Sequence, residues 1–196
     1  MSIPVMINRL LWVAMLSLVA CANNQVDDLL SVSTQTTNTV DAVAPSQPTS
    51  LSPEMEQVLR EHARLRAKVG VEPLQWSKPL AAYAQAWADQ LARKGCAFKH
   101  RPRSGAWAQQ HGENIFSGTQ GYYTPESGVK SWADEKSLYN HGPFGQITQG
   151  GVVGHYTQIV WENSKRLGCG VSQCGGNMIM VCNYEPAGNV IGRMPY

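Results

Sequence analysis

The chain has 196 residues, 43% of them hydrophobic, and a formal net charge of +2. This length and composition suit one globular domain with a sizeable core. So small a net charge gives no argument for binding to nucleic acid or to an acidic membrane surface, and we expect no nucleic-acid partner. No internal repeat is visible, which argues against a solenoid.

The first twenty residues have the pattern of a secretory signal. Arg9 is followed by an apolar run over residues 10–20 that is too short to span a bilayer comfortably. The run ends in Leu18-Val19-Ala20-Cys21, which looks like a bacterial lipobox. We therefore predict a signal peptide over residues 1–20 and a lipidated Cys21 at the start of the mature protein. Ordinary signal cleavage is the alternative, because Ala20-Cys21-Ala22 also has the small-x-small form.

The segment over residues 21–51 is predicted to be a flexible tether. It is rich in Asn, Gln, Ser and Thr, and it has too few large apolar side chains to offset its ordering entropy. The lipid on Cys21 would anchor it to a membrane, and the protein would meet the membrane through that lipid alone. Residue 22 is Ala rather than Asp, which by resemblance to enteric lipoproteins indicates the outer membrane. Without lipidation of Cys21 the protein would be secreted.

The remaining residues, 52–196, are predicted to form the folded domain. Three helices are expected from their N-cap residues, from proline in the first turn and from apolar spacing. The first begins at Ser52-Pro53 and stops before Gly70, the second begins at Ser77 and stops before Gly95, and the third begins at Thr124-Pro125.

Residues 167–184 predict a β-hairpin. Gly175-Gly176 lies between two runs rich in β-forming residues, as in a tight two-residue turn. Both faces of the returning strand are apolar, so it should be central and covered on each side by helices. We therefore predict an α+β fold, a three-layer α-β-α sandwich with a central antiparallel sheet.

The hairpin register also predicts the disulfides. It places Cys169 directly opposite Cys182, at a separation that a disulfide can bridge. Cys174 points to the opposite face of the strand and is free to reach Cys96. We predict Cys169–Cys182 and Cys96–Cys174, which leaves Cys21 as the odd one of five cysteines. A zinc knuckle is the alternative, but an exported chain favours disulfides.

Two stretches resemble signatures of the CAP superfamily, which comprises cysteine-rich secretory proteins, antigen 5 and plant pathogenesis-related group one proteins. The first runs from Gly154-His155-Tyr156 to Trp161, and the second covers residues 181–190. The resemblance extends from about Pro53 to Tyr196, and the plant branch is nearest, as Arg166-Leu167-Gly168-Cys169 indicates. It implies an extracellular protein with an SCP-like domain.

The family places two histidines and two glutamates around a central cleft. By motif these positions fall on His100, Glu113, Glu135 and His155. The resemblance implies a bound metal for some members, and imidazole ligands suit Zn or Cu. The same groups are the parts of a hydrolase, with Glu113 and Glu135 as candidate catalytic bases beside a metal-bound water. A purely structural cluster of ion pairs and hydrogen bonds is the other reading.

Two positions depart from the family pattern. The family often has Ser after its first cleft histidine, where this chain has Arg101, so a nucleophilic role for that Ser does not carry over. The family's His-Asn pair on the first helix is His62-Ala63 here, and we expect His62 to be structural.

We therefore expect a binding module displayed on the cell envelope, with a metal-capable cleft and a lipid, glycan or protein ligand. The alternative is a metal-dependent, peptidase-like hydrolase acting in the envelope. The residues leave open whether the protein is an enzyme.

Overall fold

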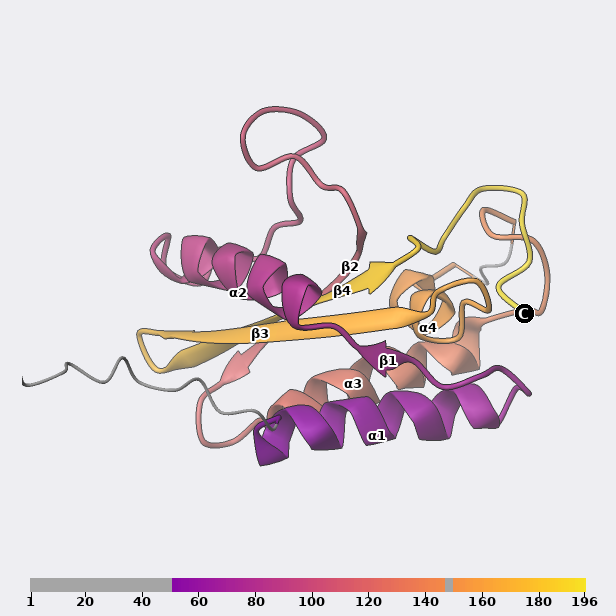
Figure 1. Ribbon diagram of the computed structural model, residues 1–196, viewed down its shortest axis with the longest axis horizontal. Helices are drawn as coiled ribbons and strands as arrows, with labels where there is room; N and C mark the ends of the chain where they lie inside the picture. Colours follow the sequence, from indigo (N-terminus) through magenta and orange to yellow (C-terminus); the bar gives the residue numbers. More distant parts are fainter. Residues whose placement is uncertain (1–50, 147–149) are drawn as a thin grey trace, which may run out of the picture. The chain divides into compact units, whose positions relative to one another are not determined.

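The computed structural model describes residues 51–146 and 150–196, which place helices on both faces of a four-stranded sheet (Figure 1). The predicted signal peptide, Cys21 and the tether up to residue 50 lie outside the described residues. In the described part of the chain, no helix is both long enough and apolar enough to cross a membrane.

The three longer helices begin where their caps predict. They are α1 (Pro53–Ala67), α2 (Lys78–Ala92) and α3 (Pro125–Asp134), and the cap side chains of Ser52, Ser77 and Thr124 each accept a backbone N–H of the first turn. Gly70 and Gly95, at φ of +75° and +69°, then turn the chain away from α1 and α2. A 3₁₀ turn, η1 (Glu135–Leu138), follows α3, and a short helix, α4 (Gly154–Ile159), carries the first signature stretch.

The sheet has the strand order β1-β3-β4-β2. The strands are β1 (Gln75–Trp76), β2 (Gly112–Thr119), β3 (Arg166–Cys174) and β4 (Asn177–Glu185). The three long strands are antiparallel as predicted, but β1 runs parallel to β3, so the sheet as a whole is mixed. A two-residue strand contains no alternation from which its pairing could be read.

The hairpin has the predicted register. Gly175 and Gly176 both have positive φ, as a type I′ turn requires, and Cys169 pairs with Cys182 across β3 and β4. These two cysteines form one disulfide, and Cys96 and Cys174 form the other, with Cα atoms 5.8 Å apart. The disulfides therefore tie β3 to β4, and the loop after α2 to the hairpin.

Helices cover the two faces of the sheet in the predicted three layers (Figure 1). On one face, Ile179 and Val181 of β4 pack with α2. On the other face, Met180, Cys182 and Tyr184 pack with α1, α3 and α4. A Cβ atom at Gly168 or Gly170 would overlap the α2 backbone, so these glycines allow the helix to lie directly on β3.

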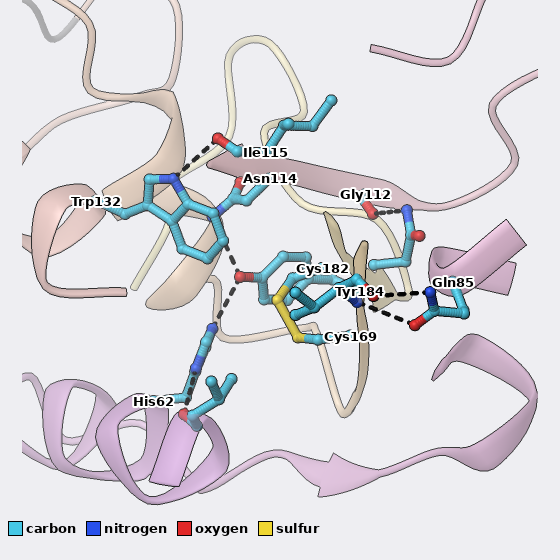
Figure 2. The surroundings of a disulfide bond; sticks show 12 residues. His62, Gln85, Gly112, Asn114, Ile115, Trp132, Cys169, Cys182 and Tyr184 are labelled. Carbon is cyan, nitrogen blue, oxygen red and sulfur yellow. Dashed lines mark hydrogen bonds between the residues drawn. A yellow bond between two sulfur atoms is a disulfide. The ribbon is translucent and has the colours of Figure 1, made fainter. Parts of the chain in front are cut away.

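The outer edge of β3 extends beyond its partner. β1 pairs only with Arg166 and Leu167, which leaves the later residues of β3 without a neighbouring strand. The side-chain amide of Gln85, from α2, covers this edge at Val171. Its Oε1 accepts the Val171 N–H at 3.0 Å, and its Nε2 donates to the Val171 carbonyl at 2.9 Å (Figure 2). One side chain thus makes both hydrogen bonds of a strand residue.

Candidate functional site

Glu135 and His155 form the first of two histidine–glutamate pairs. Oε1 of Glu135 lies 2.6 Å from Nδ1 of His155, and Oε2 accepts the backbone N–H groups of His155 and Tyr156 at 2.9 and 3.1 Å. Because the carboxylate can only accept, Nδ1 carries the proton and Nε2 keeps its lone pair. The indole of Trp132 stacks on the imidazole, with ring planes 13° apart. Orientation and tautomer of His155 are therefore both fixed.

The same carboxylate holds the signature helix α4. Its N-cap residue, Val153, offers no side-chain hydrogen bond, and a helix this short is unstable by itself. Glu135 satisfies N–H groups at its start, and the buried guanidinium of Arg66 binds the carbonyls of Ile159 and Trp161 at its end, at 2.9 and 2.8 Å. Both caps come from other elements, so α4 depends on the tertiary fold.

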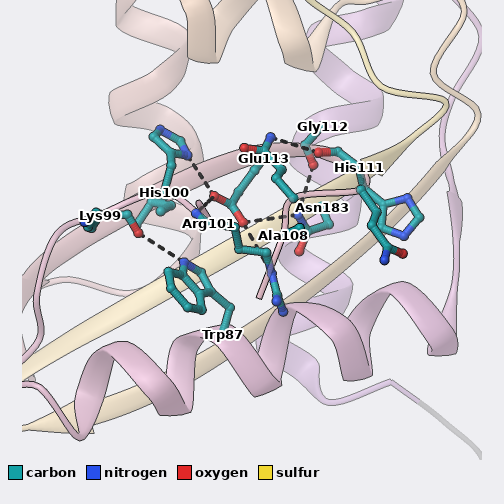
Figure 3. Close-up of polar contacts among 12 residues, drawn as sticks. Trp87, Lys99, His100, Arg101, Ala108, His111, Gly112, Glu113 and Asn183 are labelled. Carbon is teal, nitrogen blue, oxygen red and sulfur yellow. Dashed lines mark hydrogen bonds and ion pairs between the residues drawn. The ribbon is translucent and has the colours of Figure 1, made fainter. Parts of the chain in front are cut away.

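His100 and Glu113 form the second pair, shown in Figure 3. Glu113 lies on β2 with its side chain fully buried, and its Oε1 is 2.8 Å from Nδ1 of His100 and accepts the Arg101 N–H at 3.0 Å. The His100 side chain is 52% exposed. The tautomer is again fixed with the proton on Nδ1, so that the Nε2 lone pair is the one left for a ligand.

Adjacent residues of β2 contact the two pairs. Glu113 and Asn114 are consecutive, so their side chains point to different faces of the sheet. Glu113 holds His100 on the α2 side, whereas Asn114 donates to the backbone carbonyl of His155 at 3.1 Å. Within residues 51–146 and 150–196, no group of three or more His, Cys, Asp or Glu side chains is arranged to hold a metal ion. The four predicted residues are thus two pairs rather than one closed metal shell.

Comparisons with known proteins bear on this geometry. The model of the cysteine-rich secretory protein family, CAP, matches residues 44–184, which is more than half of the chain. The chain belongs to the CAP family. It is 44% identical to pathogenesis-related protein 1B of Nicotiana tabacum, over 72% of this chain and 80% of that protein. It is 41% identical to pathogenesis-related protein 1 of Arabidopsis thaliana, over 76% and 86%. A solved structure of NaASP2 with Zn²⁺ has a TM-score of 0.64 at 27% identity and covers 76% of this chain and 88% of that chain.

The two disulfides agree with this family assignment. Disulfides persist in oxidising compartments and are rare in the cytoplasm. A CAP domain with Cys96–Cys174 and Cys169–Cys182 closed is therefore one that folds and works outside the cytoplasm.

His62 has the structural role expected of it in this CAP domain (Figure 2). Its Nδ1–H donates to the Val58 carbonyl at 2.7 Å, and its Nε2 accepts from the Tyr184 hydroxyl at 2.8 Å. Burial lowers the pKa of His62 to about 4, so the ring is neutral. The Tyr184 hydroxyl also accepts from Asn114, which in turn contacts the His155 backbone. A buried hydrogen-bonded chain thus runs from α1 to the backbone carbonyl of His155.

Arg101 has a role that the sequence alone did not reveal. Its side chain is 3% exposed, and its guanidinium lies 3.7 Å from the centre of the Tyr83 ring and within 5.3 Å of Trp87 and Trp107. Burial lowers the pKa of Arg101, while Tyr83 and Glu113 oppose the shift. The residue attaches the loop before β2 to α2, and its backbone orients Glu113. The sequence did contain one signal for this role. Tyr83 and Trp87 are four residues apart, so they share one face of the predicted helix and together form an aromatic surface on which an arginine can stack.

Proposed function

We propose that the protein is a CAP-domain binding module, displayed on the cell envelope by a lipid on Cys21, whose cleft can take up a metal through His100 and His155. The observation that carries this proposal is the common design of the two pairs. In each, a carboxylate accepts from Nδ1, so that the Nε2 lone pair is the one left for a ligand. Carboxylate support of this kind orients metal-binding histidines in proteins.

The donor set fits a loosely held Zn or Cu ion better than a structural one. Two imidazole nitrogens suit either metal, but a closed zinc site uses four protein ligands and a catalytic one usually three. His100 and His155 would supply the nitrogen ligands, and solvent would complete the coordination. The metal would act as a Lewis acid toward an oxygen-bearing ligand. The zinc in the solved structure of NaASP2 supports this capacity by analogy.

A metal-dependent hydrolase is the second candidate, with Glu113 or Glu135 as the base. The geometry favours it less, because a general base must reach the proton that it removes. Glu135 already accepts two backbone N–H groups and the His155 ring, and Glu113 is fully buried against His100 and Arg101. Hydrolysis that is lost on chelation and restored by zinc would favour this candidate. Activity that survives Glu113→Ala and Glu135→Ala together would exclude it.

The ligand class of the binding module is an envelope or extracellular lipid, glycan or protein. The proposal places signal cleavage after residue 20, a tether over residues 21–51, and attachment to the outer membrane through Cys21. Mass spectrometry of the N-terminal peptide tests this arrangement. Acyl chains on Cys21, and release of the Cys21→Ser protein into the soluble fraction, are expected. An unmodified Cys21 in the mature protein would make the protein a secreted one.

The deciding experiment is the metal content of the purified protein after incubation with zinc or copper, followed by dialysis. Bound metal is expected in the wild type and should be lost in both His100→Ala and His155→Ala. His141→Ala is the matched control, because His141 is exposed, belongs to neither pair and has its ring nitrogen on the Tyr196 carbonyl. A wild type that takes up no metal, or equal loss in all three variants, would refute the metal-capable cleft.

A further inference from the structure

A hollow of about 630 Å³ begins at His100 and extends beyond the two histidine–glutamate pairs to His111. Most of its wall is the loop that joins α2 to β2, closed by Ala187 after β4. The side chains that line it are those of His100, Arg101, Arg103, Gln109, Gln110 and His111. Figure 3 shows His100 and His111 on opposite sides of Glu113.

Arg101 and Arg103 are the cationic residues that line this hollow. The stretch from Arg93 to Gly112 contains five Lys or Arg residues and no Asp or Glu, although the whole chain has a net charge of only +2. The buried carboxylate of Glu113 is bound by His100 and by the backbone of Arg101, and it lies 3.8 Å from Nε of Arg101, so the charge of Arg101 is already paired. In the part of the chain that the structure describes, Arg103 has no ion pair and its side chain is exposed. Among the described residues, Arg103 is therefore the lining cation that is left to pair with an anion.

The wall that bears these groups is held in place from α2. The Tyr83 hydroxyl donates to the Ala108 carbonyl and accepts the Gln110 N–H, both at 3.1 Å. The Gln109 side chain donates to the His111 carbonyl at 2.9 Å. The His111 ring lies edge-on to Tyr83, with centroids 4.9 Å apart, and its nitrogens have no hydrogen-bond partner among the described residues. The backbone that carries Gln110 and His111 is thus fixed in place, which lowers the cost of binding a ligand there.

We infer that this hollow is a binding subsite for an oxyanion, a phosphate or carboxylate group carried by a small molecule. Arg103 supplies the charge and a fork of donors that matches an oxyanion, and His111 and the Gln110 amide supply further hydrogen-bonding groups. This inference deepens the proposed binding function and rests on it, because it names the chemistry of the ligand. It does not depend on a metal, since Arg103 and His111 belong to neither histidine–glutamate pair.

The test is a nuclear magnetic resonance titration of the purified metal-free protein with inorganic phosphate and, separately, with galacturonate, at constant ionic strength. Saturable shifts at Arg103 and His111 are expected, and the tighter of the two ligands identifies the favoured oxyanion. Arg103→Gln should weaken binding at least fivefold. The matched control is Arg93→Gln, which removes the same charge from the same stretch but outside the hollow, and it should change affinity less than twofold.

Absence of saturable shifts with both ligands would overturn the inference, as would equal weakening by Arg103→Gln and Arg93→Gln, which indicates general charge attraction. The metal-uptake experiment on His100→Ala and His155→Ala tests the proposed function independently of anion binding. Anion binding that fails while metal uptake persists removes the subsite and leaves the proposed function. Metal uptake that fails while anion binding persists removes the metal-capable cleft and leaves the subsite.

Discussion

Acidification should destabilise the fold through His62. In the folded protein this ring donates to the Val58 carbonyl through Nδ1 and accepts the Tyr184 hydroxyl through Nε2. Protonation of Nε2 would remove that acceptor and place a charge in a fully buried site, close to the Arg66 guanidinium and to Glu61. Burial therefore holds the pKa of His62 at about 4 in the folded state, against 6.5 for the free side chain.

The sign and size of the effect follow from this difference. The unfolded chain takes up the proton below pH 6.5 and the folded chain only near pH 4, so stability is complete above 6.5 and falls as the pH drops between the two values. The full difference corresponds to about 3 kcal/mol of unfolding free energy. Between pH 7.5 and pH 5.0 the expected loss from His62 alone is about 2 kcal/mol.

The assay is denaturant unfolding at these two pH values, followed by tryptophan fluorescence with the disulfides intact. The wild type is compared with His62→Gln, which has no titrating ring, and with His141→Gln as a matched control for an exposed histidine. His62→Gln should be less stable at the higher pH and should lose about 2 kcal/mol less than the wild type on acidification. An equal loss in wild type and His62→Gln would refute the reasoning.

Three further changes test other parts of the fold. Glu135→Ala removes the acceptor at the start of α4 and should lower the free energy of unfolding by about 1–2 kcal/mol, whereas Glu135→Gln, which keeps an acceptor, should lower it less. Equal free energies of unfolding for the two variants would exclude the capping role. Replacing Cys169 and Cys182 together by Ala opens a loop of 13 residues and should lower the free energy of unfolding by about 3 kcal/mol, the loss expected from chain entropy. The melting temperature should fall accordingly, and an unchanged melting temperature would contradict this. Gly170→Ala drives a Cβ into the backbone at Gln85 and should cost about 1–3 kcal/mol, and a neutral result would show that α2 can move away from β3.

The features that the sequence predicted best are those that neighbouring residues in the chain determine. Gly175-Gly176 fixed the turn, the turn fixed the register, and the register placed Cys169 opposite Cys182. The helix starts were equally local, because a capping hydroxyl and a proline suffice to mark them. The apolar faces of β4 then required helices on both sides, which is the observed layering.

What the sequence could not provide are contacts between distant residues. Glu113 and Glu135 were recognised by motif, but only the fold shows that each holds a different histidine. The direction of β1 depends on the path from α1 into α2, and two residues carry no pattern that could reveal it. In the sequence, Arg101 was visible only as a departure from the family pattern. Its stacking role could not be predicted, because Tyr83 and Trp87 lie on α2, far from it in the chain.

The Gln85 amide on the outer edge of β3 has a consequence for the behaviour of the protein at high concentration. Open strand edges recruit strands from other copies, which leads to domain swapping and aggregation. Here the N–H and carbonyl of Val171, in the middle of the open edge, are already taken by a side chain of the same molecule. A second copy would have to displace Gln85 before its own strand could pair. We therefore expect the outer edge of β3 to resist strand exchange between copies at high concentration.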